Sequence, residues 1–208
     1  MRDGFKMFKI AGAFGVLLAV VGLTAQEPHG VRAVQTFPTM SAALDAVRAK
    51  YGVHTGLEYA AGDTDRLPIS LDFAPPVAGV VFDSLAAQKP GYVWKLEDGV
   101  YDVYPKLTTD SILDVRIREF AVQNATPEEV STAIENLPEV QEWLRKHHVQ
   151  RNELETGPRW AKSDPRTSLT VRGVALRSVL NRLVQAMGRE NWFVVRYGEH
   201  EGYIGIYI

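Results

Sequence analysis

Carboxylates, histidines and aromatic side chains are the residues of this 208-residue chain whose types could do chemistry. Two acidic runs, ELE at 153–155 and EHE at 199–201, could supply the pair of carboxyl groups that hydrolyses a glycosidic bond. That reaction needs both groups at a set separation across a sugar-binding cleft, and these runs lie in segments expected to be loops or turns. A carboxylate-dependent hydrolase is therefore the least favoured of the three functions that we consider.

The histidines form no recognisable metal or acid–base motif. His147 and His148 are adjacent, whereas a helix brings metal ligands to one face at spacings of three or four residues. We interpret them as a solvated helix end. The chain has no cysteine, which excludes thiolate zinc sites, a thiol nucleophile and disulfides, and it lacks HExxH, GxSxG and glycine-rich phosphate loops. We expect no enzymatic activity, no metal and no cofactor.

The aromatic residues give a better indication of binding, because they could anchor a protein partner or stack on sugar rings. Trp94 and Trp192 occupy equivalent positions in two predicted hairpins, and both are expected in the core. Trp160 lies in a polar segment where packing does not explain it. The candidate interface residues are Trp143, Trp160, Tyr203 and Tyr207.

The N-terminus resembles a secretory signal. Residues 1–9 carry three basic residues and one acidic residue, and an uncharged apolar run continues from Ile10 to Ala25. This run is shorter than the roughly 20 residues that span a bilayer comfortably, which favours a signal peptide at 1–25 cleaved after Ala25. The alternative is an uncleaved inner-membrane anchor, which would be the only membrane contact. Both place the protein outside the cytoplasm, as a periplasmic or secreted chain.

The charge balance sets one class of partner aside. The whole chain has 23 basic and 25 acidic residues. Because residues 1–25 hold three basic residues and one acidic residue, 20 basic and 24 acidic residues remain after cleavage, a net charge of −4. Nucleic-acid binding requires clustered lysines and arginines that neutralise phosphates, so we expect no nucleic-acid partner.

In the first half, helical and extended patterns alternate. After a flexible lead-in or first strand at 26–38, apolar residues recur at helical spacing over 40–51, with Thr39 as N-cap and Gly52 as the stop. The segment VHTGLEYA is expected to be extended, and ISLDF alternates like a strand.

A second helix and a hairpin complete this half. The helical stripe begins at Val77 and ends before the break Lys89-Pro90-Gly91. The segment YVWKLEDGVYDVYP then predicts a hairpin turning at Asp98-Gly99, because type I′ turns need positive φ.

The second half follows the same order. Alternation over 113–118 predicts a strand, and Thr126-Pro127-Glu128-Glu129 predicts a capped helix that Pro138 breaks or restarts. Residues 151–166 are expected to form a loop. A strand SLTVRGV, a regular helical stripe over 176–187 and a terminal hairpin, WFVVRYG with GYIGIYI, follow.

An offset of 98 residues aligns the halves. It pairs Ser70 with Ser168, Leu71 with Leu169, Val81 with Val179, Leu85 with Leu183 and Trp94 with Trp192. The matches fall on equivalent predicted elements, so we interpret them as a duplication, two similar units that arose separately being the alternative. The predicted fold class is α+β: two repeated modules, strand-helix-strand-strand-helix-hairpin, each a small mixed sheet with two helices packed on one face.

The order of elements resembles the short N-terminal (STN) modules of secretins and TonB-dependent receptors. The resembling segments are SAALDAVRAKYGV, LPISLDFAPPVAGVVFDSLAAQKPGYVWKLEDGVYDVYP and SLTVRGVALRSVLNRLVQAMGRENWFVVRYG. The expected STN-like modules span 39–106 and 107–208, the second with an inserted helix and loop at about 138–166. The resemblance implies a periplasmic module that docks on other proteins in envelope assembly or signalling, with no catalytic residues.

Three functions follow from these observations. The first is a non-enzymatic, exported protein-interaction or scaffolding module with an envelope protein partner, docking by a strand edge or by the inserted segment. The second is a protein that binds peptidoglycan or another glycan through exposed aromatic residues. The third is the hydrolase described above.

Overall fold

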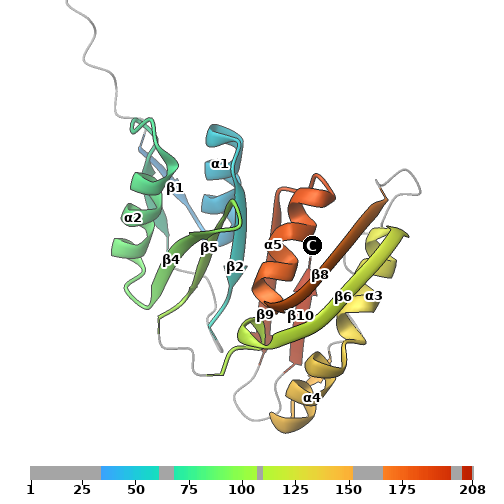
Figure 1. Ribbon diagram of the computed structural model, residues 1–208. Coiled ribbons are helices and arrows are strands. Elements are labelled where there is room, and N and C mark those ends of the chain that lie inside the picture. Colours follow the sequence, from blue (N-terminus) through green and yellow to red (C-terminus); the bar gives the residue numbers. More distant parts are fainter. Residues whose placement is uncertain (1–33, 61–67, 107–109, 152–165, 198–202, 208) are drawn as a thin grey trace, which may run out of the picture. The chain divides into compact units, whose positions relative to one another are not determined.

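The computed structural model describes residues 34–60, 68–106, 110–151, 166–197 and 203–207, all within one compact unit (Figure 1). The fold is α+β, as the sequence patterns predicted. The predicted signal at 1–25 and the predicted interface residue Trp160 lie outside the described residues. We call residues 34–106 the first half and residues 110–207 the second half.

Helices and strands alternate along both halves. The first half contains β1 (Val34–Phe37), α1 (Met40–Tyr51), β2 (His54–Glu58), β3 (Ile69–Asp72), α2 (Ala78–Gln88), β4 (Tyr92–Glu97) and β5 (Val100–Pro105). The second half contains the 3₁₀ turn η1 (Ile112–Asp114), β6 (Arg116–Ala125), α3 (Pro127–Glu135), α4 (Pro138–Lys146), β7 (Gln150–Arg151), β8 (Thr167–Ala175), α5 (Leu176–Ala186), β9 (Asn191–Tyr197) and β10 (Tyr203–Tyr207).

The described strands form three sheets. Two are antiparallel ribbons, β1 with β3 and β6 with β8, and the third has six strands in the order β4-β5-β2-β9-β10-β7. The six-stranded sheet takes three strands from each half, joined where β2 and β9 pair in parallel. One hydrogen-bonded ladder therefore crosses the boundary predicted between the two modules at residue 107.

The two halves have the same connectivity. In the first half β1 pairs with β3, β4 with β5 in antiparallel and β2 with β5 in parallel. In the second half β6 pairs with β8, β9 with β10 in antiparallel and β7 with β10 in parallel. Helices α2 and α5 lie 98 residues apart at both ends, the offset that aligns the two halves of the sequence.

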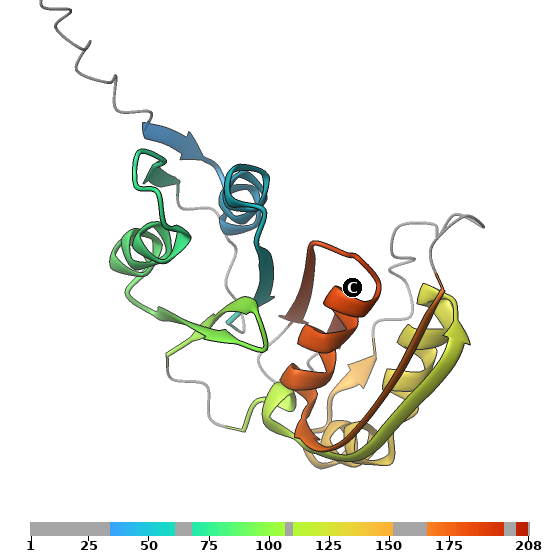
Figure 2. The same cartoon turned by 45° about the horizontal axis from the view of Figure 1, so that its top comes forward.

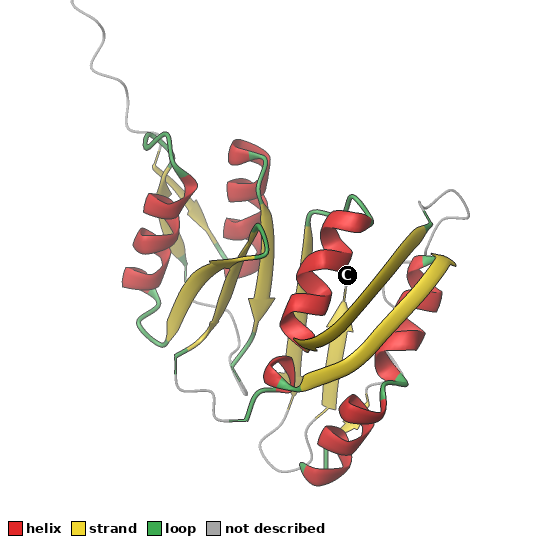
Figure 3. Ribbon diagram, viewed as in Figure 1, coloured by secondary structure: helices red, strands yellow, loops and turns green. Residues whose placement is uncertain are grey.

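Helices α1, α2 and α5 lie between sheets, which differs from the predicted arrangement of one sheet with two helices on one face. Helices α1 and α2 contact the β1–β3 ribbon as well as β2 and β4. Helix α5 lies between the β6–β8 ribbon and β9, as Figures 2 and 3 show. The difference arises because the ribbons β1–β3 and β6–β8 are separate from the six-stranded sheet and give these helices a second sheet to pack against.

Local signals predicted several element ends correctly. Thr39 caps α1 by accepting a hydrogen bond from the Ala42 amide, and Gly52 ends the helix with a φ of 63°. The β4–β5 turn has positive φ at Asp98 and Gly99, as a type I′ turn requires. Helix α3 begins with a complete capping box between Thr126 and Glu129.

Two local predictions were wrong. The strand predicted over 113–118 begins only at Arg116, because Ile112 and Leu113 are both buried in a 3₁₀ turn that the Ser111 hydroxyl caps. Two consecutive buried residues suit a turn of helix better than a strand with alternate faces. Arg151, predicted as the start of a loop, ends β7, a two-residue strand that pairs in parallel with β10 and is too short to show a period.

The register of the six-stranded sheet separates two faces. One row runs across the strands through Trp94, Val103, Leu57 and Phe193, and all four belong to the core that α1 and α2 cover. The next row runs through Lys95, Asp102, Gly56 and Trp192, and Trp192 belongs to the core that α5 covers. The helices of the two halves therefore pack on opposite faces of this sheet.

Candidate binding pocket and the buried junction

Three of the four predicted interface residues lie within the described residues, one on a helix and two on a strand. Trp143 lies in α4 with 5% of its surface exposed, its indole donates to the Asp110 carbonyl, and its ring stacks on His147 with centroids 4.3 Å apart. Tyr203 and Tyr207 lie on β10, in register with Tyr197 and Phe193 of β9. Trp143 therefore packs inside the second half and offers little surface to a partner.

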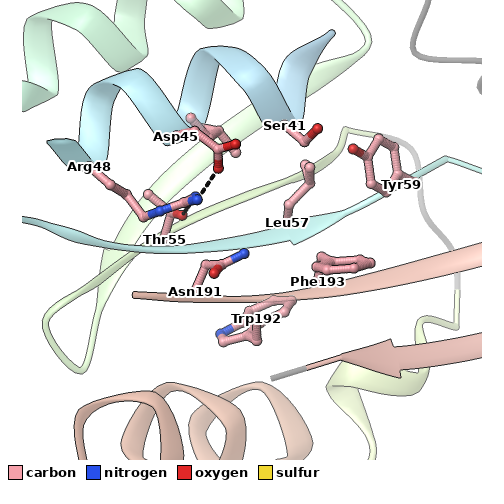
Figure 4. Close-up of a pocket in the computed structure, with 10 residues that line it drawn as sticks. Ser41, Asp45, Arg48, Thr55, Leu57, Tyr59, Asn191, Trp192 and Phe193 are labelled. Carbon is pink, nitrogen blue, oxygen red and sulfur yellow. Dashed lines mark hydrogen bonds and ion pairs between the residues drawn. The ribbon is translucent and has the colours of Figure 1, made fainter. Parts of the chain in front are cut away.

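A pocket of about 240 Å³ opens between α1 and the β2–β9 pair (Figure 4). Its floor is apolar, with Leu57 and Phe193 on the sheet and Tyr59 beside the end of β2. Its rim is polar and combines both charge signs, from Ser41, Asp45 and Arg48 on α1 and from Thr55 and Asn191 on the strands. An apolar floor inside a polar rim is typical of sites that receive one side chain of a partner protein.

Local structure holds the Arg48 guanidinium across the pocket. Asp45 and Arg48 are three residues apart on α1, so the helix brings them together as an ion pair. The guanidinium also donates to the Thr55 hydroxyl on β2 at 2.9 Å, and its Nε lies 3.7 Å from the Glu190 carboxylate. The rim is therefore fixed by bonds to α1, to β2 and to the turn that precedes β9.

The floor exists because two strands whose paired residues are 136 positions apart in sequence become neighbours. Phe193 pairs with Leu57 across β2 and β9 and packs at the edge of the first-half core. Figure 4 shows Phe193 and Trp192 on opposite sides of β9, with Phe193 on the side of α1. A His54 ring nitrogen lies 2.9 Å from the Arg189 carbonyl, which holds the start of β2 against the turn before β9.

A network of buried polar residues lies on the other face of the same strand pair. The amide of Asn181 on α5 donates to the Asp102 carboxyl at 3.0 Å and accepts from the Trp192 indole at 2.6 Å. Arg177 donates to Glu58 at 3.0 Å, and Ser111 donates to the same carboxylate at 2.5 Å. We call this network, with the β2–β9 ladder, the buried junction.

The pKa values of two carboxyl groups near the junction shift in opposite directions, one because of burial and the other because of a bonded lysine. Removal from water raises the pKa of Asp102 to about 7, although the Asn181 hydrogen bond and the positive charges of Arg177 and Lys95 oppose the shift. The Lys95 ammonium bonded to Glu97 lowers the pKa of that more exposed carboxyl. Asp102 therefore holds a proton near neutral pH that an exposed aspartate would have lost.

The junction is closed to solvent. Asp102 and Asn181 are 0% exposed and Arg177 is 3% exposed. Within the described ranges, no three histidine or acidic side chains are grouped so that they could hold a metal ion. No helix in the part of the chain that the structure describes is long and apolar enough to cross a membrane. The polar groups of the junction thus join the halves, and the pocket is the accessible part of this region.

Comparisons with protein-family models, with curated proteins and with solved structures found no match.

Sequence reasoning missed the pocket, although part of its signal was present. WFVVRYG was predicted as a strand of the terminal hairpin, and consecutive strand residues such as Trp192 and Phe193 bear side chains on opposite faces. Nothing in the sequence indicated that β2 would be the neighbour of that strand. The rim residue Arg48 was indistinguishable from any other charged residue on the exposed side of a helix.

Proposed function

We propose that this protein is an exported, non-enzymatic interaction module of the periplasm, made of two STN-like units, that docks an envelope protein at the α1–β9 pocket. The shared connectivity of the two halves supports two copies of one module. The basic and apolar pattern of residues 1–25 supports export.

The observation that carries the docking role is the size and lining of the pocket. Ligand sites for whole small molecules usually enclose about 300–1,000 Å³, whereas this pocket has about 240 Å³ and opens at the surface. That volume suits one large apolar side chain, with the charged rim bonding to the backbone or polar neighbours of the inserted residue. A protein partner supplies such a protruding side chain.

The described tryptophans give the glycan alternative no specific support. Trp94 donates its indole N–H to Asp83 at 3.0 Å and packs among Phe82 and Tyr101. Trp143 and Trp192 are buried. Sugar binding needs open ring faces for stacking, and these three rings are engaged within the protein.

In-cell crosslinking tests the proposal. A photoreactive residue in place of Ser41, on the rim of the pocket, should give an adduct with an envelope protein. The same residue in place of Arg172, an exposed position on β8, should give none. Equal adducts from both positions, or adducts from neither, would count against the pocket.

A blocking variant makes the test specific. Ser41→Trp places a large ring at the pocket rim, and it should abolish copurification of the partner identified by crosslinking. Lys50→Trp adds the same ring at an exposed position of α1 that does not line the pocket, and binding should be unchanged. Undiminished binding by Ser41→Trp would contradict docking at this site.

A further inference from the structure

The first half has a helix–strand surface equivalent to the α5–β9 surface of the buried junction. Within the described part of the chain, no other element packs on this equivalent surface. In the second half, the Trp192 indole donates to Asn181, one residue on β9 and the other on α5. At the equivalent positions 98 residues earlier, the Trp94 indole donates to Asp83, one on β4 and the other on α2. The two halves therefore present the same helix–strand surface, with the same hydrogen bond.

The two copies of this surface differ in burial. On α5, Arg177, Ser178 and Asn181 are 3%, 8% and 0% exposed, because the first half packs on them. The equivalent residues on α2 are Gly79, Val80 and Asp83, of which Val80 is 51% exposed and Asp83 is also exposed. Val77 and Leu96 beside them are 56% and 57% exposed. We call Val77, Val80, Asp83 and Leu96 the α2–β4 surface.

The strands of the two surfaces also differ, in whether a neighbouring strand pairs with them. Strand β9 pairs with β2, whereas its counterpart β4 is a terminal strand of the six-stranded sheet among the described residues. The counterpart of β2 is β7, which pairs in parallel with β10 as β2 does with β5. Among the strands that the structure describes, β7 is the other terminal strand of that sheet. The two ends of the described six-stranded sheet are therefore equivalent to the two strands that pair in the junction. Strand β4 corresponds to β9, and strand β7 corresponds to β2.

We propose that the α2–β4 surface binds the β7 edge of a second copy of this protein, repeating between molecules the β2–β9 junction within one. The β2 edge of a second copy is occupied by its own β9, so β7 is the equivalent edge that remains. Because the two surfaces are different, the contact is head-to-tail, and successive copies extend the sheet as a chain or close it as a ring. The exposed valines and leucine become buried in that contact.

The register of the β2–β9 pairing predicts which residues of β4 and β7 lie opposite each other in the proposed contact. Thr55 pairs with Asn191 within the molecule, and the equivalent positions are Arg151 on β7 and Val93 on β4. Adjacent strands lie about 4.8 Å apart, within the range of Cα separations that a disulfide spans. The natural chain has no cysteine, so each introduced thiol is alone in its molecule.

The experiment mixes two single variants, Val93→Cys and Arg151→Cys, under mild oxidation. The mixture should form a disulfide-linked dimer containing one of each variant, and neither variant alone should crosslink at a comparable rate. Equal crosslinking of one variant with itself, or no dimer in the mixture, would overturn the proposal.

Sedimentation of the cysteine-free protein gives an independent measurement. Val80→Glu should raise the dissociation constant of self-association about tenfold or more, because it places a charge in the contact. Val34→Glu is the matched control, since Val34 on β1 is equally exposed, and it should leave association unchanged. A protein that stays monomeric at all concentrations contradicts this proposal but leaves the pocket proposal standing, because Ser41→Trp lies outside this surface.

Discussion

Asp102 illustrates how a single residue depends on the assembled molecule. Its position in a predicted hairpin strand was clear from the sequence, but its complete burial is produced by α5 lying over the sheet. Its Oδ1 atom has no hydrogen-bond partner among the described residues, although Oδ2 accepts from Asn181. A protonated carboxyl suits this site, since ionisation would leave a poorly compensated charge away from water.

The stability of the protein should therefore depend on pH through Asp102. The unfolded chain titrates this group near its ordinary pKa of about 3.9, whereas the folded protein keeps the proton until about pH 7. The contribution of the group to stability is then fully present below about pH 4 and is lost as the pH rises to about 7. The loss should amount to a few kcal/mol at most.

Asp102→Asn removes this titration and keeps an oxygen that can accept from Asn181. Its free energy of unfolding, measured by urea titration between about pH 4 and 7, should fall less steeply with pH than that of the natural protein. Glu128→Gln, at an exposed carboxyl on α3, serves as the control and should keep the natural slope. An unchanged slope in Asp102→Asn would refute the assignment.

At the scale of elements, Gly56 allows β2 and β9 to come together under α5. A Cβ atom at this position would overlap the Trp192 ring and lie 2.6 Å from Asp102 Oδ1. The flanking ladder residues Thr55 and Leu57 bear side chains on the opposite face, toward α1. The close approach of the indole thus requires glycine at this one position of the strand.

Gly56→Ala should destabilise the protein by about 1–3 kcal/mol, because the ring, the carboxyl or the strand must move. Gly91→Ala is a suitable control, since no atom lies within 4 Å of the added carbon, and it should change stability by less than about 0.5 kcal/mol. Thermal or urea unfolding of the two variants measures the difference. Equal stability of both variants would show that the indole can move at no cost.

At the scale of the whole molecule, the two halves share one sheet and one set of buried polar partners. A second half by itself would expose the edge of β9 and remove the acceptors Glu58 and Asp102 from Arg177 and Asn181. Unpaired polar groups of this kind are costly when buried, and the apolar residues around them would be exposed.

The fragment 111–208 should therefore lack a cooperative thermal transition, or melt well below the full protein. Near-ultraviolet circular dichroism follows Trp192, whose ring loses its packing against Gly56 in the fragment. The fragment 34–110 tests the reciprocal dependence and keeps more of its own core under α1 and α2. A cooperative transition of 111–208 near that of the full protein would show that the halves are independent domains.

Much of this protein was determined by the sequence alone, because the signals are local. Thr39 and Gly52 specify the ends of α1, Thr126 and Glu129 form a capping box within four residues, and Asp98-Gly99 favours a type I′ hairpin turn. The periods of the apolar residues then specified which segments are helices and strands, and hence the α+β class.

Only the tertiary structure decided which surfaces meet. Strand pairing depends on backbone groups that every residue carries, so the sequences of β2 and β9 do not record that the two strands are neighbours. The two-residue strand β7 has no period and acquires its structure from β10. The pocket floor at Phe193 and the burial of Asp102 under α5 both depend on the β2–β9 pairing, because it brings the two halves into one sheet.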